Sequence, residues 1–205
     1  MQSNMNRLRN VLKKSKVLLI FSGVLIVVLN IINYDSVSTF IGILWPIIGF
    51  LWWLFDTQLW KSKYVNRVLK LSSSFYCPNI SGRWTGTLTR DNRDHEFVIE
   101  IKQTYTSISC EAYSNHGYSK SLCSELLYDE QNDRYSFVFL WQGKTSVNTD
   151  GTPNPSNYFN GTTILTISEN CDKIEGSYFT NRSPKQTKGD IVLNNRQKEL
   201  KYAFH

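Results

Sequence analysis

Charged side chains are absent from two stretches near the N-terminus, residues 17–34 and residues 36–55. Each stretch is close to the roughly 20 apolar residues that an α-helix needs to cross a hydrocarbon core of about 30 Å. Both stretches also lack histidine, so they hold none of the ionisable groups that an ion relay normally places inside a membrane. This pattern argues against a purely soluble protein and against a multi-pass transporter.

We predict a helical hairpin that crosses the membrane twice, with spans at Val17–Asn33 and Val37–Phe55. The link around Asp35 is long enough only for a tight turn. Basic residues precede the first span and follow the second, so the positive-inside rule places both termini in the cytoplasm. The alternative is a cleaved signal peptide, but no small-x-small cleavage site precedes the second span.

The second span carries features that suit helix packing. Tryptophans crowd its end, where they fit an interfacial belt, a proline should kink it, and two glycines seven residues apart allow close helix approach. The hairpin is therefore expected to act as an anchor or by assembling. The residues that we expect in assembly are Gly42, Pro46, Gly49, Trp52 and Trp53.

Charge is distributed unevenly. Residues 1–70 carry a net charge of +7, whereas residues 71–205 carry −1. The basic excess thus lies beside the apolar spans and does not form the basic face that binding to long nucleic acid requires. We predict four regions: a basic cytoplasmic N-terminus at 1–16, the hairpin at 17–56, a short helical or irregular connector at 57–76, and a β-domain at 77–205.

The β-domain shows apolar residues alternating with polar ones in eight short runs separated by turn residues. The near-regular spacing and hairpin-length connections predict an eight-stranded antiparallel up-and-down β-barrel. One longer connection, Gly143–Tyr158, is rich in polar and turn residues and could close over a mouth. The expected strands are Arg83–Arg90, Glu96–Gln103, Ser107–Ser114, Lys120–Asp129, Arg134–Gln142, Gly161–Ser168, Lys173–Asn181 and Gly189–Asn194.

Signs of catalysis or metal binding are few. The three histidines are scattered, none of the common hydrolase, phosphate-loop or dinucleotide motifs occurs, and the four cysteines form no Cys-x-x-Cys pair. The acidic residues mostly alternate with apolar ones, as on the solvent face of a strand. We therefore predict a protein that is not an enzyme and holds no metal or cofactor, with cysteines that are buried free thiols in a reducing cytoplasm.

The segment Gly176–Gly189 is the strongest candidate for a ligand site. It gathers an aromatic ring, hydroxyl and amide groups and several cations where a strand ends and a turn begins. Guanidinium and hydroxyl donors suit a phosphate, and an aromatic face with a nearby amide suits a base. An alternative is that these cations are solvated turn residues. The candidates in this segment are Tyr178, Thr180, Asn181, Arg182 and Lys188.

Three aromatic residues on other strands extend this set: Trp84, Tyr105 and Trp141. Trp84 follows a glycine by two positions at the first strand, where a tryptophan usually plugs or lines one end of a barrel. Purely structural roles are the alternative for all three.

The layout resembles the two-transmembrane β-barrel effectors of bacterial CBASS anti-phage systems, a STING-like class of cyclic-nucleotide receptor. The resemblance covers the whole chain and rests on two spans before an eight-stranded barrel and on three motifs. These motifs are Pro78-x-Ile80-x-Gly82-x-Trp84-x-Gly86, Gly176-x-Tyr178-Phe179-Thr180-Asn181-Arg182, and Lys188-Gly189-x-Ile191-x-Leu193.

The resemblance implies a mechanism. A partner CD-NTase makes a cyclic dinucleotide during infection, the barrel binds it, and the protein forms a homo-oligomer in the inner membrane. Membrane disruption then arrests or kills the host cell, which is abortive infection. By alternation, Arg182 is expected to bind phosphate, Thr180 and Asn181 to form hydrogen bonds, and Tyr178 to stack on a base.

Two other functions remain open at this point. A membrane-anchored lipocalin-like carrier would have an apolar lumen for a lipid and no use for Arg182. A structural scaffold would have a filled barrel and no ligand.

Overall fold

The computed structural model describes residues 37–71, 75–114, 117–144, 158–182 and 185–204. The first predicted span lies outside these residues. The chain divides into two compact units. A helical unit holds the described residues up to Cys77 together with the turn Thr104–Thr106, and a barrel unit holds Pro78–Gln103 and the residues from Ser107 onward.

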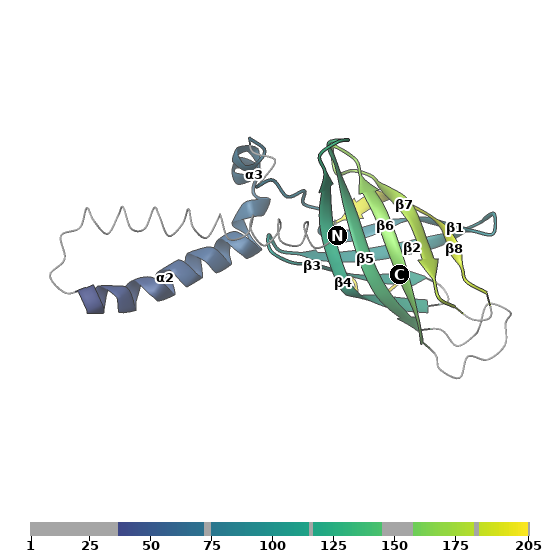
Figure 1. Cartoon of the computed structure of the whole chain (residues 1–205), viewed down its shortest axis with the longest axis horizontal. Helices are drawn as coiled ribbons and strands as arrows, with labels where there is room; N and C mark the ends of the chain where they lie inside the picture. Colours follow the sequence, from purple (N-terminus) through teal and green to yellow (C-terminus); the bar gives the residue numbers. More distant parts are fainter. Residues whose placement is uncertain (1–36, 72–74, 115–116, 145–157, 183–184, 205) are drawn as a thin grey trace. The chain divides into compact units, whose positions relative to one another are not determined.

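The helical unit contains helix α2 (Val37–Thr57), a short 3-10 helix η1 (Leu59–Lys61) and helix α3 (Lys63–Leu69) (Figure 1). Ser62 caps α3, because its hydroxyl accepts a hydrogen bond from the Val65 backbone N–H. Helix α3 lies within residues 57–76, the predicted helical or irregular connector.

A small aromatic core holds the helical unit together. Phe55 and Trp60 are buried and pack with Tyr105, whose ring centroid lies 5.1 Å from that of Phe55. The backbone N–H groups of Tyr105 and Thr106 donate to the carbonyl and the carboxylate of Asp56, at 2.9 and 2.8 Å. These bonds anchor the turn Thr104–Thr106 to the end of α2.

Helix α2 coincides with the second predicted span, and Pro46 lies inside it. Trp53 is exposed in this structure, Trp52 is half-buried against the aromatic core, and a side chain at Gly49 would meet nothing within 4 Å. The surroundings of Gly42 lie outside the described side chains. Among the described residues, no helix combines the length and apolarity that a membrane crossing requires.

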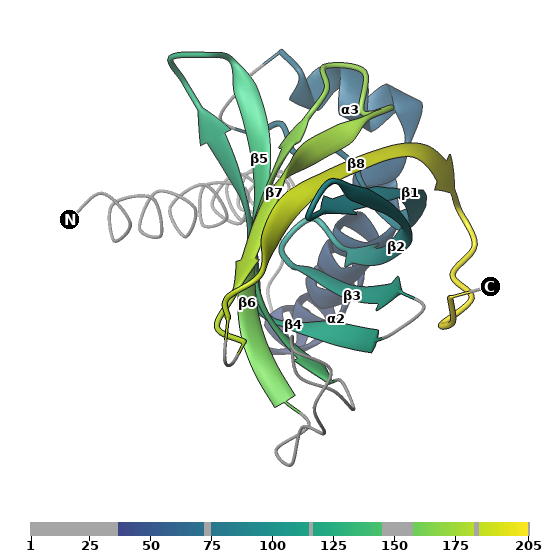
Figure 2. The same cartoon turned by 90° about the vertical axis from the view of Figure 1, so that its right-hand side faces the viewer.

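The barrel unit is a closed antiparallel barrel in which each strand pairs with its neighbours in the sequence and β8 pairs with β1 (Figures 1 and 2). All eight expected strands are present, which confirms the predicted barrel. Their bounds are β1 Gly82–Arg90, β2 Arg93–Gln103, β3 Ile108–Ser114, β4 Gly117–Asp129, β5 Arg134–Lys144, β6 Tyr158–Ile167, β7 Ile174–Thr180 and β8 Lys188–Gln197.

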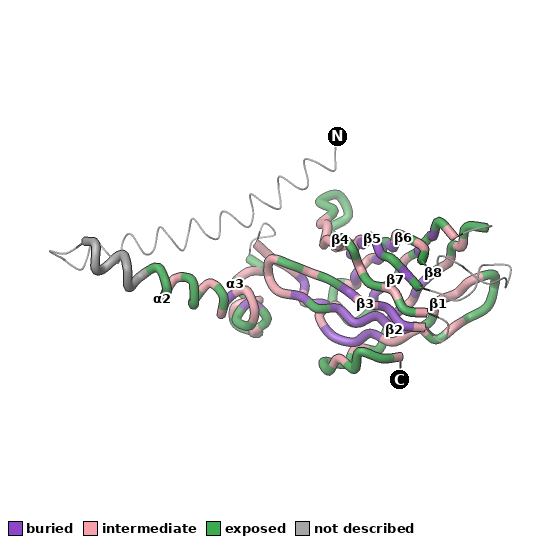
Figure 3. Tube along the Cα trace, turned by 90° about the horizontal axis from the view of Figure 1, so that it is seen from below, coloured by how far each residue is buried: buried purple, intermediate pink, exposed green. Residues whose placement is uncertain are grey.

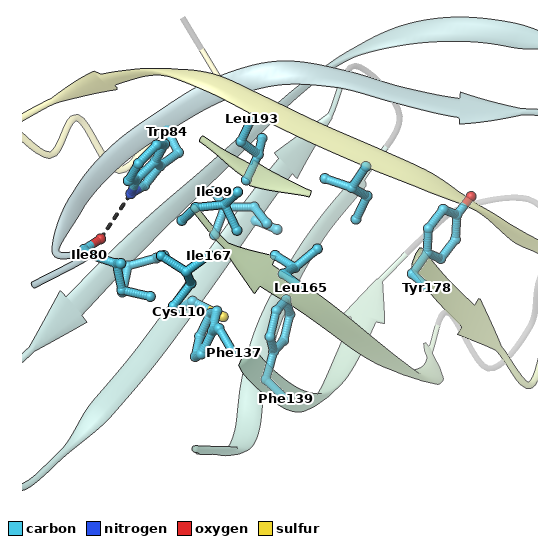
Figure 4. Close-up of a cluster of buried hydrophobic side chains, with 14 of the residues drawn as sticks. Ile80, Trp84, Ile99, Cys110, Phe137, Phe139, Leu165, Ile167, Tyr178 and Leu193 are labelled. Carbon is cyan, nitrogen blue, oxygen red and sulfur yellow. Dashed lines mark hydrogen bonds between the residues drawn. The ribbon is translucent and has the colours of Figure 1, made fainter. Parts of the chain in front are cut away.

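The middle of the barrel is packed with apolar side chains from alternating positions of the strands (Figure 4). Figure 3 shows the buried positions along the strands in purple. Trp84, Phe137, Leu165 and Leu193 are fully buried. Side chains of this size fill the interior of an eight-stranded barrel. Any ligand site in the described part of this unit therefore has to lie near an end of the barrel or on its outer face.

Strand ends differ from the prediction where the turns are tighter than expected. Asp91 and Asn92 both have positive φ, 50° and 59°, which matches a two-residue hairpin turn. Asp94 precedes the expected strand Glu96–Gln103 but lies in β2, where it accepts a hydrogen bond from the Thr89 hydroxyl at 2.6 Å. β5 and β6 likewise extend into the long predicted connection, leaving residues 145–157 between them.

The outer face of β1 and β2 carries a buried ion pair. Arg83 Nη1 lies 2.6 Å from Glu100 Oε1, and both side chains are almost completely buried. The segment 201–204 covers them: Glu100 accepts hydrogen bonds from the backbone N–H groups of Lys201 and Tyr202, and Arg83 donates to two carbonyls of the same segment. The expectation that acidic residues of the strands face solvent is wrong for Glu100, because the C-terminal segment shields it.

All four cysteines are free thiols. Only Cys110 is buried, and burial raises the pKa of its thiol. Cys123 is exposed on β4, so the expectation of buried thiols is wrong for this residue.

Candidate functional site

One end of the barrel brings together most of the predicted ligand residues. At this end, called the loop end here, β1, β3, β5 and β7 finish and β2, β4, β6 and β8 begin. The register places Trp141 opposite Gly161, Thr163 opposite Tyr178, and Tyr178 opposite Gly189. Neighbouring strands thus align these residues across the wall of the barrel.

Trp141 and Phe159 form an aromatic corner at the loop end. Their ring centroids lie 5.5 Å apart in an edge-to-face arrangement, and the indole N–H of Trp141 donates to the Thr163 hydroxyl at 2.8 Å. Gly161 provides the space for the indole, since a Cβ there would lie 2.3 Å from the Trp141 ring. Because Gly161 has no side chain, the indole of Trp141 can occupy this space.

Replacing Gly161 with alanine is expected to displace the Trp141 ring and destabilise the barrel by about 1–3 kcal/mol, as overpacking of a well-packed core does. The measurement is the melting temperature of the full chain in detergent. Thr162→Ala changes the next residue, which the strand alternation places on the outer face, and should leave the melting temperature nearly unchanged. Equal effects of the two substitutions would contradict the packing role of Gly161.

One arginine contacts this aromatic corner, and a second lies near the first. The Arg182 guanidinium carbon lies 4.9 Å from the Phe159 ring centroid, a cation–π contact. Burial lowers the pKa of Arg182, and the nearby positive charge of Arg90 lowers it further. The Asp91 carboxylate lies 3.9 Å from Arg90 Nε, so it partly balances these two positive charges. Two like charges held close together in a partly buried place are stabilised by an anion.

Tyr178 lies beside both arginines and is 6% exposed. Burial raises the pKa of its phenol, while the charges of Arg90 and Arg182 act in the opposite direction. The phenol therefore stays protonated at neutral pH and remains able to donate a hydrogen bond. Figure 4 shows its ring at the far side of the core from Trp84.

Thr180 and Asn181 serve the local fold in this structure. The Thr180 hydroxyl lies 2.7 Å from that of Thr187 and accepts a hydrogen bond from the Thr187 N–H, closing the connection to β8. The Asn181 side chain accepts a hydrogen bond from the Asn160 N–H at 2.7 Å. These bonds hold the backbone that leads into Arg182. Their predicted contacts with a ligand stay predictions.

Lys188 begins β8 at the loop end and is exposed. The remaining predicted residues lie elsewhere. Trp84 lies at the opposite end of the barrel, where its indole N–H donates to the Ile80 carbonyl at 2.8 Å and the Arg196 guanidinium covers its ring. Tyr105 belongs to the helical unit, and its hydroxyl donates to the Phe75 carbonyl. Burial raises the pKa of Tyr105 to about 12. Ligand contacts of these residues remain untested.

Sequence reasoning missed two residues of the loop end, Arg90 and Phe159. Arg90 reaches Tyr178 and Arg182 because barrel closure pairs β1 with β8, with Thr89 opposite Asp190. Phe159 lies between the end of the predicted loop and the start of the predicted strand. Pairing the first predicted strand with the last, as a closed barrel requires, would have placed Arg90 near Tyr178 and Arg182.

Aromatic rings and two arginines at one end of a closed barrel are groups that suit a small anionic ligand with flat rings. Residues 75–195 match the family described as "Cap15, cyclic dinucleotide receptor domain". The match spans more than half of the chain, and the chain belongs to this family. It carries a cyclic dinucleotide receptor domain of the β-barrel effectors of CBASS, which confirms the resemblance seen in the sequence. No curated protein was found to match the chain.

Proposed function

We propose that this chain is a membrane-bound CBASS effector that binds its cyclic dinucleotide at the loop end of the barrel. The observation that carries this assignment is the grouping of Arg90, Arg182 and Tyr178 beside an aromatic corner. A cyclic dinucleotide has two phosphates and two bases. The arginines would bind phosphate, and the rings of Phe159 and Trp141 would contact a base.

The packed core supports the loop end as the place of binding. Phe137 and Leu165 fill the middle of the barrel and are fully buried, so a ligand enclosed there would need large rearrangement. The same packing disfavours the lipocalin-like alternative, because a lipid chain needs a long apolar lumen. Residues 145–157 connect the two strands that carry the aromatic corner, so they join this end of the barrel.

The effector step is proposed as ligand-driven assembly in the inner membrane. A ligand shifts an equilibrium only by the difference in its affinity for the two states. The dinucleotide, made by a partner CD-NTase, would therefore bind the assembled form more tightly. The two spans would then associate through Gly42, Gly49 and the tryptophan-rich end of the second span, and would disrupt the bilayer. Growth arrest or death of the infected cell follows.

Dye-loaded vesicles carrying the full chain test this proposal. A panel of cyclic dinucleotides with purine and pyrimidine bases is added, and dye release and subunit number are measured together. One or more members of the panel should cause assembly and release, whereas linear dinucleotides and fatty acids should not. Absence of binding to every cyclic dinucleotide, or binding of fatty acid instead, would overturn the assignment.

A further inference from the structure

Helix α3 carries a second apolar face that is exposed among the residues that the structure describes. Tyr64, Val68 and Leu71 recur at helical spacing and are 85%, 65% and 86% exposed. The turn that continues the helix keeps Leu71 in line, since its N–H donates to the Val68 carbonyl. An apolar face this open suits a partner that offers apolar surface of its own.

The opposite side of α3 is already used. Val65 and Leu69 pack against the buried pair Phe55 and Trp60. The exposed face is therefore a separate surface of the same helix and cannot fold back onto the core of the helical unit without breaking that packing. Its occupant is therefore not the described core of the helical unit.

Charge identifies the kind of occupant. Four cations, Lys61, Lys63, Arg67 and Lys70, flank the exposed face, and residues 57–90 contain no aspartate or glutamate. All four are exposed. A second copy of the chain would bring an equally basic face to a symmetric contact and would be repelled. An anionic surface would be attracted, and it has to accept apolar side chains between the cations.

The position of α3 in the chain, directly after α2 and η1, indicates the same kind of occupant. Helix α2, which precedes α3 across the short helix η1, exposes Trp45, Phe50 and Trp53. Aromatic rings followed by lysine and arginine are typical of the boundary between hydrocarbon and headgroups. A helix with apolar residues on one side and cations beside them lies in the plane of that boundary.

We propose that α3 binds the surface of an anionic bilayer, with Tyr64, Val68 and Leu71 inserted among the headgroups and the four cations bound to lipid phosphates. This proposal rests on the membrane attachment proposed above and adds a requirement for anionic lipid. Each cation near such a surface strengthens binding by roughly fivefold at moderate ionic strength. Salt should weaken the contact, because it screens the charges.

Hydrogen–deuterium exchange on the full chain in vesicles tests the contact directly. The vesicles contain phosphatidylcholine alone or phosphatidylcholine with phosphatidylglycerol. The peptide covering residues 62–71 should exchange more slowly when phosphatidylglycerol is present, and high salt should remove the difference. The variant Lys63→Gln/Arg67→Gln/Lys70→Gln should show no dependence on phosphatidylglycerol. The control Lys120→Gln/Lys173→Gln/Lys198→Gln loses the same charge from the barrel and should behave like the wild type.

Exchange that is equal in the two lipids would overturn the proposal. Slower exchange that depends on protein density and not on lipid charge would also overturn the proposal. A second copy of the chain would then cover the exposed face of α3. Nucleotide-triggered dye release, measured on the same vesicles, reports separately on the proposed function. If release fails while lipid-dependent protection persists, the effector mechanism is wrong and the surface contact stands.

Discussion

Replacing Arg182 with alanine is expected to weaken cyclic dinucleotide binding by roughly 10- to 100-fold while the barrel stays folded. A hydrogen bond to a charged group contributes about 1.5–3 kcal/mol, and each 1.4 kcal/mol is a tenfold change in affinity. The guanidinium is only partly buried and stacks on Phe159, so its removal leaves the core intact. Titration calorimetry on the full chain measures the affinity, and the melting temperature reports on the fold.

Two further variants sharpen this test. Lys173→Ala removes one positive charge at the opposite end of the barrel and should bind nucleotide like the wild type. Arg182→Lys keeps the charge but loses the planar fork that matches a phosphate, so it should recover only part of the affinity. If the Arg182→Ala variant bound the cyclic dinucleotide as tightly as the Lys173→Ala variant, Arg182 would not belong to the binding site.

Replacing Glu100 with glutamine is expected to destabilise the barrel by about 3–5 kcal/mol, because breaking a buried ion pair leaves an uncompensated charge. Arg83 would keep its positive charge while almost completely buried. The substitution also puts an amide where Glu100 accepts hydrogen bonds from the backbone of Lys201 and Tyr202. The melting temperature of the full chain should fall by roughly 10 °C or more.

The pair Lys173–Glu175 provides a matched control. It has the same 2.6 Å separation, but its side chains are 47% and 54% exposed, against 3% and 0% for the pair Arg83–Glu100. Exposed ion pairs contribute at most about 1 kcal/mol. Glu175→Gln should therefore change the melting temperature by only a few degrees. A similar loss from both substitutions would show that the C-terminal segment does not shield Arg83 and Glu100 in solution.

The strands were predictable because their signal is local. Alternation of apolar and polar residues reports directly on which side chains point inward, and turn residues such as Asp91 and Asn92 mark where a chain reverses. The strand ends were less predictable. Both residues of that turn adopt positive φ, so β1 and β2 are joined by a turn of only two residues. The alternation of residues alone predicted a longer connection.

The site was only partly predictable. Tyr178 and Arg182 lie close together in the sequence, and strand alternation already placed them on one face. Arg90 comes from β1 and meets them only because the barrel closes β8 onto β1. Thr180 shows the opposite effect: its residue type suited a ligand, yet its hydroxyl closes the connection to Thr187.

Periodicity, charge and turn residues in the chain were sufficient to establish an eight-stranded barrel and the segment that carries Tyr178 and Arg182, because these signals act between residues that are near neighbours. Barrel closure and the covering of Glu100 by residues 201–204 join parts of the chain that are about a hundred residues apart. No local pattern records such contacts. The folded structure alone therefore decides that Arg90 joins the other residues of the loop end and that a strand carboxylate is buried on the outer face.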